Sequence, residues 1–237
     1  MIHGQTAFHE GVLGGIVLGP FKLVFAVGLA LMLLLCVALS IDWFFVARIW
    51  PDGVVHLRHL LAEELGQGIA LAAKQGGTAG QISGPANGLY GVLFEATGIH
   101  EMGMRFANPW ALSIPDTLVR RAYLAHREAV ETAMLGTQLL GVRLAILARF
   151  LPPLLLAVAV GALDGLTQRA IRRSCGGRES ASLYHRAKYL QMVLLGLGGA
   201  GLLIWPAPVA WAWCAGLIAV MTGGLARLQW TYYKKHL

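Results

Sequence analysis

The sequence predicts an all-α membrane protein with about four transmembrane helices and a helical periplasmic region between the first and second. Hydrophobic residues make up 57% of the 237 residues and charged residues only 13%, about half the usual share in a soluble domain. Four segments are apolar over roughly the length that crosses a 30 Å hydrocarbon core. The basic residues are spread unevenly over the segments between them, which predicts their orientation.

The first predicted transmembrane helix covers Val24–Ile41, which contains no charged residue. A secretory signal peptide is the alternative. However, the run exceeds the usual 7–15 or so apolar residues, and Asp42 and three bulky aromatic and apolar side chains follow where a cleavage site needs small ones. Trp43 and Trp50 suit a membrane interface. Residues 1–47 are therefore taken as an N-terminal segment with a retained helix.

Residues 48–138 form the predicted periplasmic region, since their basic and acidic residues are nearly balanced. Apolar residues recur at helical spacing over Val54–Lys74, so we expect a helix there. The Gly-rich run Gly76–Gly88 reads as a loop. We expect a weaker helix over Leu89–Ala107, interrupted at Gly98 and Gly103. Asp116 is then expected to cap a long helix that runs into the next membrane segment.

Residues 139–237 form a predicted three-helix transmembrane region. The spans are expected at about Leu139–Leu163, Tyr189–Trp205 and Val209–Leu225, with a turn at Pro206–Pro208. Pro152 and Pro153 are expected to kink the first of these spans or to mark its membrane entry. The third span of the chain carries Gly196, Gly198, Gly199 and Gly201, and small residues let helices approach closely in lipid.

The sequence leaves the role of Arg143 and Arg149 open. The favoured interpretation places both outside the hydrocarbon, where an arginine can reach the interface at small cost. In the other interpretation, Arg149 faces a partner helix or pairs with a carboxylate.

A short basic segment, residues 164–188, connects two of the spans. It holds six Lys and Arg residues against Asp164 and Glu179. The bias toward basic residues on the cytoplasmic side predicts that this hairpin and both termini are cytoplasmic. Gly176 and Gly177 are expected to end one helix, and Ser180 or Ser182 to cap the next.

This hairpin is the candidate partner-binding site. Arg169, Arg172 and Arg173 fall on one helix face, and Asp164 is expected to pair with Arg169 or Arg172. One interpretation is a basic loop that orients the protein and touches anionic lipid headgroups. The other is a docking site for an acidic surface of a cytoplasmic partner. The candidate residues are Asp164, Arg169, Arg172, Arg173, Gly176, Gly177, Arg178, Glu179, Ser180, Tyr184, His185 and Lys188.

Other classes of site find little support. Cys36, Cys175 and Cys214 show no zinc or disulfide spacing. His56 and His59 with Glu63 lack a further metal ligand. No phosphate-binding loop motif is present, and no nucleophile is arranged with Tyr184 and His185. We therefore expect no cofactor, no catalytic activity and no direct nucleic-acid binding.

The order D-G-L-x-x-R-x-I-R-R-x-x-G-G-R-E-S followed by Y-H-x-A-K, over Asp164–Lys188, resembles the signature of a family of integrating conjugative element membrane proteins. The resemblance is specific over this segment and architectural elsewhere. It implies membership of a conjugative type IV secretion apparatus in a bacterial inner membrane. The family has no assigned catalytic residues, so none is carried over.

The leading hypothesis is a non-enzymatic inner-membrane subunit that contacts the coupling-protein ATPase or the channel through its basic hairpin. Its expected partners are membrane lipids and other secretion subunits, and association of several copies is also allowed. The alternative is a small-solute transporter or channel subunit, which would need polar groups at mid-membrane. The first, third and fourth spans contain no charged residue. A membrane-embedded enzyme would need a clustered acid, base or metal set that the sequence does not show.

Overall fold

The computed structural model describes residues 3–107, 114–175 and 181–233, and within these ranges it contains helices and no β-strand. Within the same ranges, four stretches are long and apolar enough to cross a membrane: Phe21–Arg48, Arg127–Ser174, Ser182–Ile204 and Trp211–Thr231. Both findings agree with a multi-pass, all-α membrane protein. The elements are α1 (His3–Arg48), α2 (Val54–Lys74), α3 (Gly80–Tyr90), the π-helix η1 (Gly91–Glu95), α4 (Ile99–Ala107), α5 (Ile114–Ala125), α6 (Arg127–Arg149), α7 (Leu151–Ser174), α8 (Ala181–Ile204) and α9 (Trp211–Thr231).

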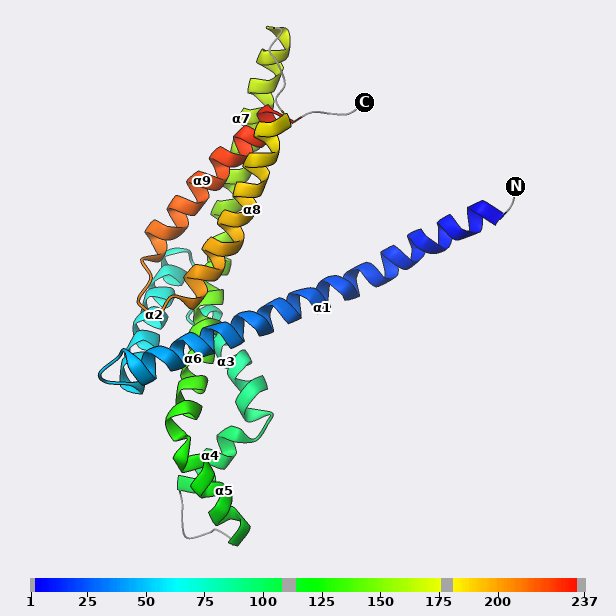
Figure 1. Cartoon of the computed structure of the whole chain (residues 1–237). Coiled ribbons are helices and arrows are strands. Elements are labelled where there is room, and N and C mark those ends of the chain that lie inside the picture. The colour runs from blue at the N-terminus through cyan, green and yellow to red at the C-terminus, as the bar shows by residue number, and fades with distance from the viewer. Residues whose placement is uncertain (1–2, 108–113, 176–180, 234–237) are drawn as a thin grey trace.

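Helix α1 projects away from the rest of the molecule (Figure 1). Its 46 residues extend well beyond the predicted span on both sides. From Phe21 to Leu33 its side chains are exposed, whereas Ala38, Asp42 and Val46 are buried where α1 crosses α6. An apolar surface of this size is expected to be covered by lipid or by another protein.

Helices α2 and α3 pack against α6 and form the core. Helix α2 has the bounds that the sequence predicts, because its apolar residues recur on one face. The predicted loop over Gly76–Gly88 is wrong, since α3 occupies most of it. A Cβ at Gly141 of α6 would lie 2.5 Å from Cα of Ala86, so the two helices touch backbone to backbone. The buried members of this core are Ala72, Ile82, Ala86, Val142, Ala145, Ile146, Val209 and Trp211.

The segment between α3 and α6 is more broken than the sequence predicts. Gly98 has φ +74° and separates η1 from α4, so the interruption expected there is confirmed. Gly103 lies inside α4, where the expected interruption is wrong. Helix α5 begins at Ile114, two residues before Asp116, so Asp116 does not cap it. The expected continuous helix is also broken, because the chain turns at His126 before α6 begins.

Helices α6 and α7 follow one another almost end to end and form the long rod of the molecule (Figure 1). Pro152 and Pro153 lie in the first turn of α7, where a missing N–H has no helical partner to lose. The helix is interrupted at Phe150, directly before these prolines, where a kink was expected. Membrane entry at this point stays a prediction. Helix α9 packs along α7, and α8 packs along α9. The predicted turn at Pro206–Pro208 joins α8 to α9. The predicted domain boundary between residues 138 and 139 falls within α6.

Candidate functional site

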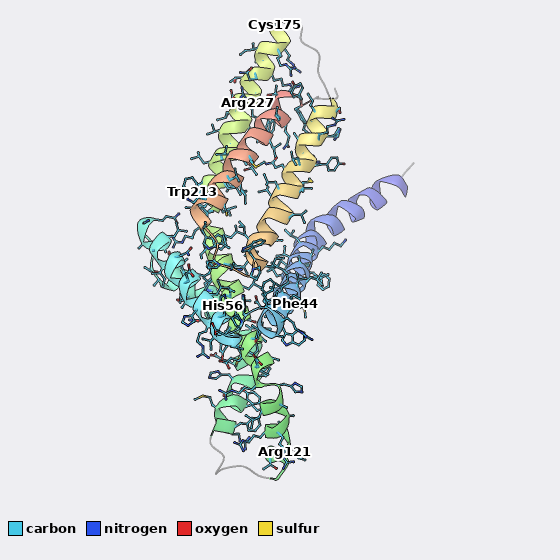
Figure 2. All side chains as sticks on the ribbon, turned by 60° about the vertical axis from the view of Figure 1, so that its left-hand side comes forward. Phe44, His56, Arg121, Cys175, Trp213 and Arg227 are labelled. Atoms are coloured by element: carbon cyan, nitrogen blue, oxygen red, sulfur yellow. The ribbon has the colours of Figure 1, made fainter. Side chains whose placement is uncertain are left out.

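The predicted hairpin lies at one end of the bundle of α7, α8 and α9, where Cys175 is labelled in Figure 2. Helix α7 carries Asp164 and the three arginines Arg169, Arg172 and Arg173. Helix α8 carries Tyr184, His185 and Lys188, and begins at Ala181. Ser182 therefore lies within the first turn of α8 and does not precede it. Gly176, Gly177, Arg178, Glu179 and Ser180 lie outside the described residues.

Two of the hairpin arginines contact tyrosines that follow α9. The guanidinium of Arg172 lies 4.1 Å from the ring centroid of Tyr232, and that of Arg169 lies 5.5 Å from the ring centroid of Tyr233. Tyr184 of α8 packs edge-on against Tyr233, with ring centroids 5.7 Å apart. A cation–π contact contributes about 0.5–1 kcal/mol at an exposed site. This arginine–tyrosine cluster (Arg169, Arg172, Tyr184, Tyr232 and Tyr233) therefore joins the ends of all three helices.

The tyrosines of this cluster were missed by the sequence analysis. Tyr232 and Tyr233 directly follow α9 and precede Lys234 and Lys235 in the sequence. The predicted topology places the end of the last span at the same level as the basic hairpin. That topology alone could therefore have indicated that these tyrosines lie near the hairpin arginines. On its charge alone, the tail predicts only a cytoplasmic position.

Asp164 pairs with α9 and not, as expected, with an arginine of its own helix. Its Oδ2 lies 2.5 Å from Nε of Arg227, and both side chains are about half exposed. This pairing follows from the close contact of α7 and α9. A Cβ at Gly161 would overlap the carbonyl oxygen of Gly223, and one at Gly165 would lie 2.5 Å from that of Arg227. Small residues thus bring Arg227 within reach of Asp164.

The glycines that the sequence analysis singled out lie on a different helix. A Cβ added to Gly196, Gly199 or Gly201 of α8 would meet nothing within 4 Å, and at Gly198 it would meet only side-chain carbons. Among α7, α8 and α9, glycine-mediated close packing therefore joins α7 to α9. Packing of the α8 glycines against a partner helix stays a prediction.

A buried ion pair forms a second polar site, at the other end of the bundle. Glu64 of α2 and Arg143 of α6 have side chains 0% and 1% exposed, and Nη2 of Arg143 donates to Oε1 of Glu64 at 2.9 Å. Glu64 also accepts from the backbone N–H of Val209 at 3.0 Å and from Nε1 of Trp211 at 2.5 Å. The carboxylate thus binds the start of α9.

Arg143 holds the end of α8 and the turn in the same way. Its guanidinium donates to the backbone carbonyl oxygens of Leu203 at 3.3 Å, of Ala207 at 2.9 Å, and of Trp205. The last carbonyls of a helix have no partner within the helix and carry partial negative charge, so a cation stabilises them. The buried Glu64–Arg143 pair therefore fixes the α8–α9 hairpin onto α2 and α6.

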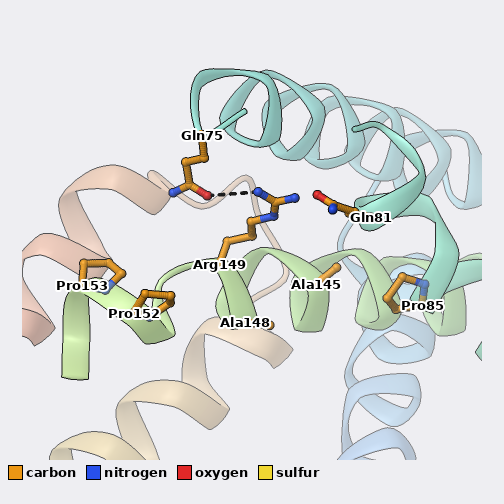
Figure 3. A pocket seen from close by; sticks show the side chains of 8 residues that line it. All are labelled: Gln75, Gln81, Pro85, Ala145, Ala148, Arg149, Pro152 and Pro153. Carbon is orange, nitrogen blue, oxygen red and sulfur yellow. Dashed lines mark hydrogen bonds between the residues drawn. The ribbon is translucent and has the colours of Figure 1, made fainter. Parts of the chain in front are cut away.

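Both arginines left open by the sequence now have partners. Arg143 is buried in protein and pairs with the carboxylate of Glu64. Arg149, for which a carboxylate partner was considered, contacts an amide among the described residues. Arg149 is half-buried, and its Nη1 donates to Oε1 of Gln75 at 3.3 Å (Figure 3). No local pattern indicates either partner, because Glu64 and Arg143 are 79 residues apart in the chain.

The helices between α2 and α6 carry an aromatic group of residues. The hydroxyl of Tyr90 lies 2.6 Å from Nδ1 of His100, across the break at Gly98. Burial, together with nearby Glu95 and Tyr123, raises the pKa of Tyr90.

His56, considered for metal binding, instead stacks on Trp50 with ring centroids 4.5 Å apart. In the described part of the chain, no three His, Cys, Asp or Glu side chains gather as metal ligands would.

Comparison with known proteins identifies a family for most of the chain. Residues 49–229 match the model of a family described as IncC plasmid conjugative DNA transfer protein DtrJ-like. The match covers well over half of the chain and includes Glu64, Arg143, Asp164 and the hairpin arginines. Neither a curated protein nor a solved structure matches the chain.

Proposed function

Because the chain belongs to the DtrJ-like family of conjugative DNA transfer proteins, we propose that it is a non-enzymatic inner-membrane subunit of a conjugative type IV secretion apparatus. The family places its role in conjugative DNA transfer. The resemblance of Asp164–Lys188 to integrating conjugative element proteins agrees with such a role, and the type of mobile element remains part of the proposal. The proposed subunit anchors in the membrane and docks a cytoplasmic partner.

The proposed layout puts α7, α8 and α9 across the membrane, with the Pro206–Pro208 turn on the periplasmic side. In this layout, Arg149 and Arg169 mark the two ends of the part of the rod that crosses the membrane, and the Asp164–Arg227 pair lies just inside the cytoplasmic end. Twenty residues at 1.5 Å per residue separate them by about 30 Å, the thickness of the hydrocarbon core. Trp205 and Trp213, beside the turn, are exposed as interfacial tryptophans are. Helices α2–α6 then lie mainly outside, and α1 forms a separate crossing.

The observation that carries the docking proposal is the arginine–tyrosine cluster. The end of α7 projects beyond the ends of α8 and α9 (Figure 1). Arg169 and Arg172 are held against the two tyrosines that follow α9, so their positions are set by the fold and not by a mobile loop. A basic surface held in this way suits an acidic surface on the coupling-protein ATPase or on the base of the channel.

A single charge reversal tests this proposal. Arg172→Glu in the complete apparatus should lower DNA transfer roughly tenfold or more, since like charges facing each other across an interface cost several kcal/mol. It should also reduce recovery of the ATPase or channel subunits with the solubilised protein. Arg121→Glu is the matched control, because Arg121 is exposed at the opposite end of the molecule (Figure 2).

The experiment includes a check that the variant protein keeps its orientation, because arginines also set topology. A reporter fused at the C-terminus should report the same side for Arg172→Glu and for the natural protein. Normal transfer and normal recovery of partners by a correctly oriented Arg172→Glu protein would refute the docking role.

A further inference from the structure

A cavity of about 610 Å³ lies between the α2–α3 connection and the junction of α6 with α7 (Figure 3). Its polar side is formed by Gln75, Gln81 and Arg149, and its apolar side includes Pro85, Pro152 and Pro153. No carboxylate lines it. The cavity thus combines one cation and two amides with an apolar wall.

Among the described residues, no carboxylate lines this cavity to neutralise the charge of Arg149. Its hydrogen-bond partner is the neutral amide of Gln75. Arg143, on the same helix six residues earlier, shows the contrast, because there the protein supplies Glu64. A guanidinium has a fixed fork of donors that fits the oxygens of a phosphate, so Arg149 is suited to an anion from outside the chain.

The loop that carries Gln75 is shaped around this guanidinium. Gly76 has φ +71°, which favours glycine, and a Cβ at Gly77 would overlap Nη1 and Nη2 of Arg149. The side chain of Gln81 also comes close to this position, with its Oε1 among the atoms that such a Cβ would meet. The backbone therefore lies directly against Arg149, and the amides of Gln75 and Gln81 flank it.

A second cavity of about 440 Å³ lies next to the first. Pro153 lines both, and the second runs between α7 and α9 past Leu156, Val160 and Gly224. It is mainly apolar as far as Asp164 and Arg227. A groove of this kind beside a polar cavity matches the two parts of a lipid, a headgroup and an acyl chain.

We propose that the Arg149 cavity binds the phosphate of an anionic phospholipid from the outer leaflet, with one acyl chain in the groove between α7 and α9. This inference rests on the proposed membrane layout, which puts Arg149 at the outer boundary of the hydrocarbon. Phosphatidylglycerol fits the lining better than phosphatidylethanolamine. The amides can hydrogen-bond its hydroxyl groups, whereas no carboxylate of the lining is present to pair with an ammonium group.

Lipid retention by the purified full-length protein tests the proposal. The protein in neutral detergent receives equal amounts of phosphatidylglycerol and phosphatidylethanolamine, and native mass spectrometry counts the lipids retained. The natural protein should retain phosphatidylglycerol preferentially. Arg149→Gln should weaken that retention roughly tenfold, the scale for losing one charged hydrogen-bonding partner. Lys74→Gln is the matched control, since it removes one exposed charge next to Gln75 without altering the lining.

Two further variants keep the test decisive if Arg149→Gln folds poorly. Gly77→Ala keeps the charge of Arg149 but displaces its guanidinium, so retention should fall as well. Gly224→Leu fills the acyl-chain groove at a position where a Cβ meets nothing within 4 Å, and should also lower retention. Gel filtration and helical content select the variants that remain folded.

Three results would overturn the inference. They are equal retention of the two lipids, unchanged retention in folded Arg149→Gln and Gly77→Ala proteins, and displacement of phosphatidylglycerol by inorganic phosphate. The last would mean that the cavity takes a free anion. Because the assay measures purified protein and not DNA transfer, its failure leaves the proposed function intact, and a failed transfer test leaves lipid retention measurable.

Discussion

Removing the negative charge of Glu64 is expected to destabilise the α8–α9 hairpin strongly. Every described partner of this carboxylate is a donor: Nη2 of Arg143, the N–H of Val209 and Nε1 of Trp211. In Glu64→Gln, the amide NH₂ must face one of these donors, and Arg143 stays buried without its counterion. Breaking one partner of a buried ion pair costs about 3–5 kcal/mol.

This cost translates into a measurable shift in thermal unfolding. At roughly 2–4 °C per kcal/mol for a chain of this size, the loss lowers the Tm by roughly 6–20 °C. The assay is thermal unfolding of the detergent-solubilised protein, followed by circular dichroism. Glu63→Gln is the matched control, because Glu63 is exposed, adjacent in sequence, and bonded only to Gln67 among the contacts described.

A double variant separates pairing from local damage. In Glu64→Gln/Arg143→Met no unpaired charge stays buried, so it should lose less stability than the sum of the two single variants. Two results would contradict this role of the Glu64–Arg143 pair in holding the α8–α9 hairpin. One is that Glu64→Gln unfolds at the same temperature as Glu63→Gln. The other is that the stability losses of Glu64→Gln and Arg143→Met simply add in the double variant.

Two further predictions concern the bundle itself. Gly161→Leu should prevent the close contact of α7 and α9, because even a Cβ there overlaps the carbonyl oxygen of Gly223. It should lower the Tm clearly, whereas Gly196→Leu, at a position open within the chain, should leave the Tm nearly unchanged; similar values would contradict the packing. Tyr232→Ala should cost about 0.5–1 kcal/mol through loss of the contact with Arg172, and Tyr232→Phe should retain most of it; equal losses in both, by thermal unfolding, would assign the effect to the hydroxyl and not to the ring face.

Hydropathy predicted the coarse architecture, because it acts over whole segments; the orientation that charge predicts stays a prediction. Helix α2 was predicted to the residue, since Leu57, Leu60 and their neighbours repeat at helical spacing and are buried on one side. The spans α8 and α9 were expected from their apolar runs and from the Pro206–Pro208 turn. These features depend on local composition, which a single sequence contains.

Helix α3 was missed because its stability comes from packing and not from propensity. Glycines and Pro85 make it a poor helix by composition, and helix propensity is a weak guide where tertiary contacts decide. The same small residues let α3 lie directly on Gly141 of α6. A sequence pattern that indicates a loop in water thus forms a helix against a neighbouring helix.

The polar contacts were least predictable. The hairpin arginines were recognised from charge, but their tyrosine partners lie on another span, and the partner of Asp164 does too. The buried Glu64–Arg143 pair joins two helices far apart in the chain. Its members look like ordinary surface residues in sequence, so the three-dimensional arrangement alone reveals them.

Labelling of single cysteines tests the proposed membrane layout most directly. Cys36 and Cys214 are replaced by serine, which leaves the exposed Cys175 at the hairpin, and a second protein carries Arg121→Cys with Cys175 also replaced. In cells with a permeable outer membrane and a sealed inner membrane, a membrane-impermeant thiol reagent should label Arg121→Cys and should label Cys175 only after the inner membrane is opened. Labelling of Cys175 in sealed cells, with Arg121→Cys protected, would contradict the layout.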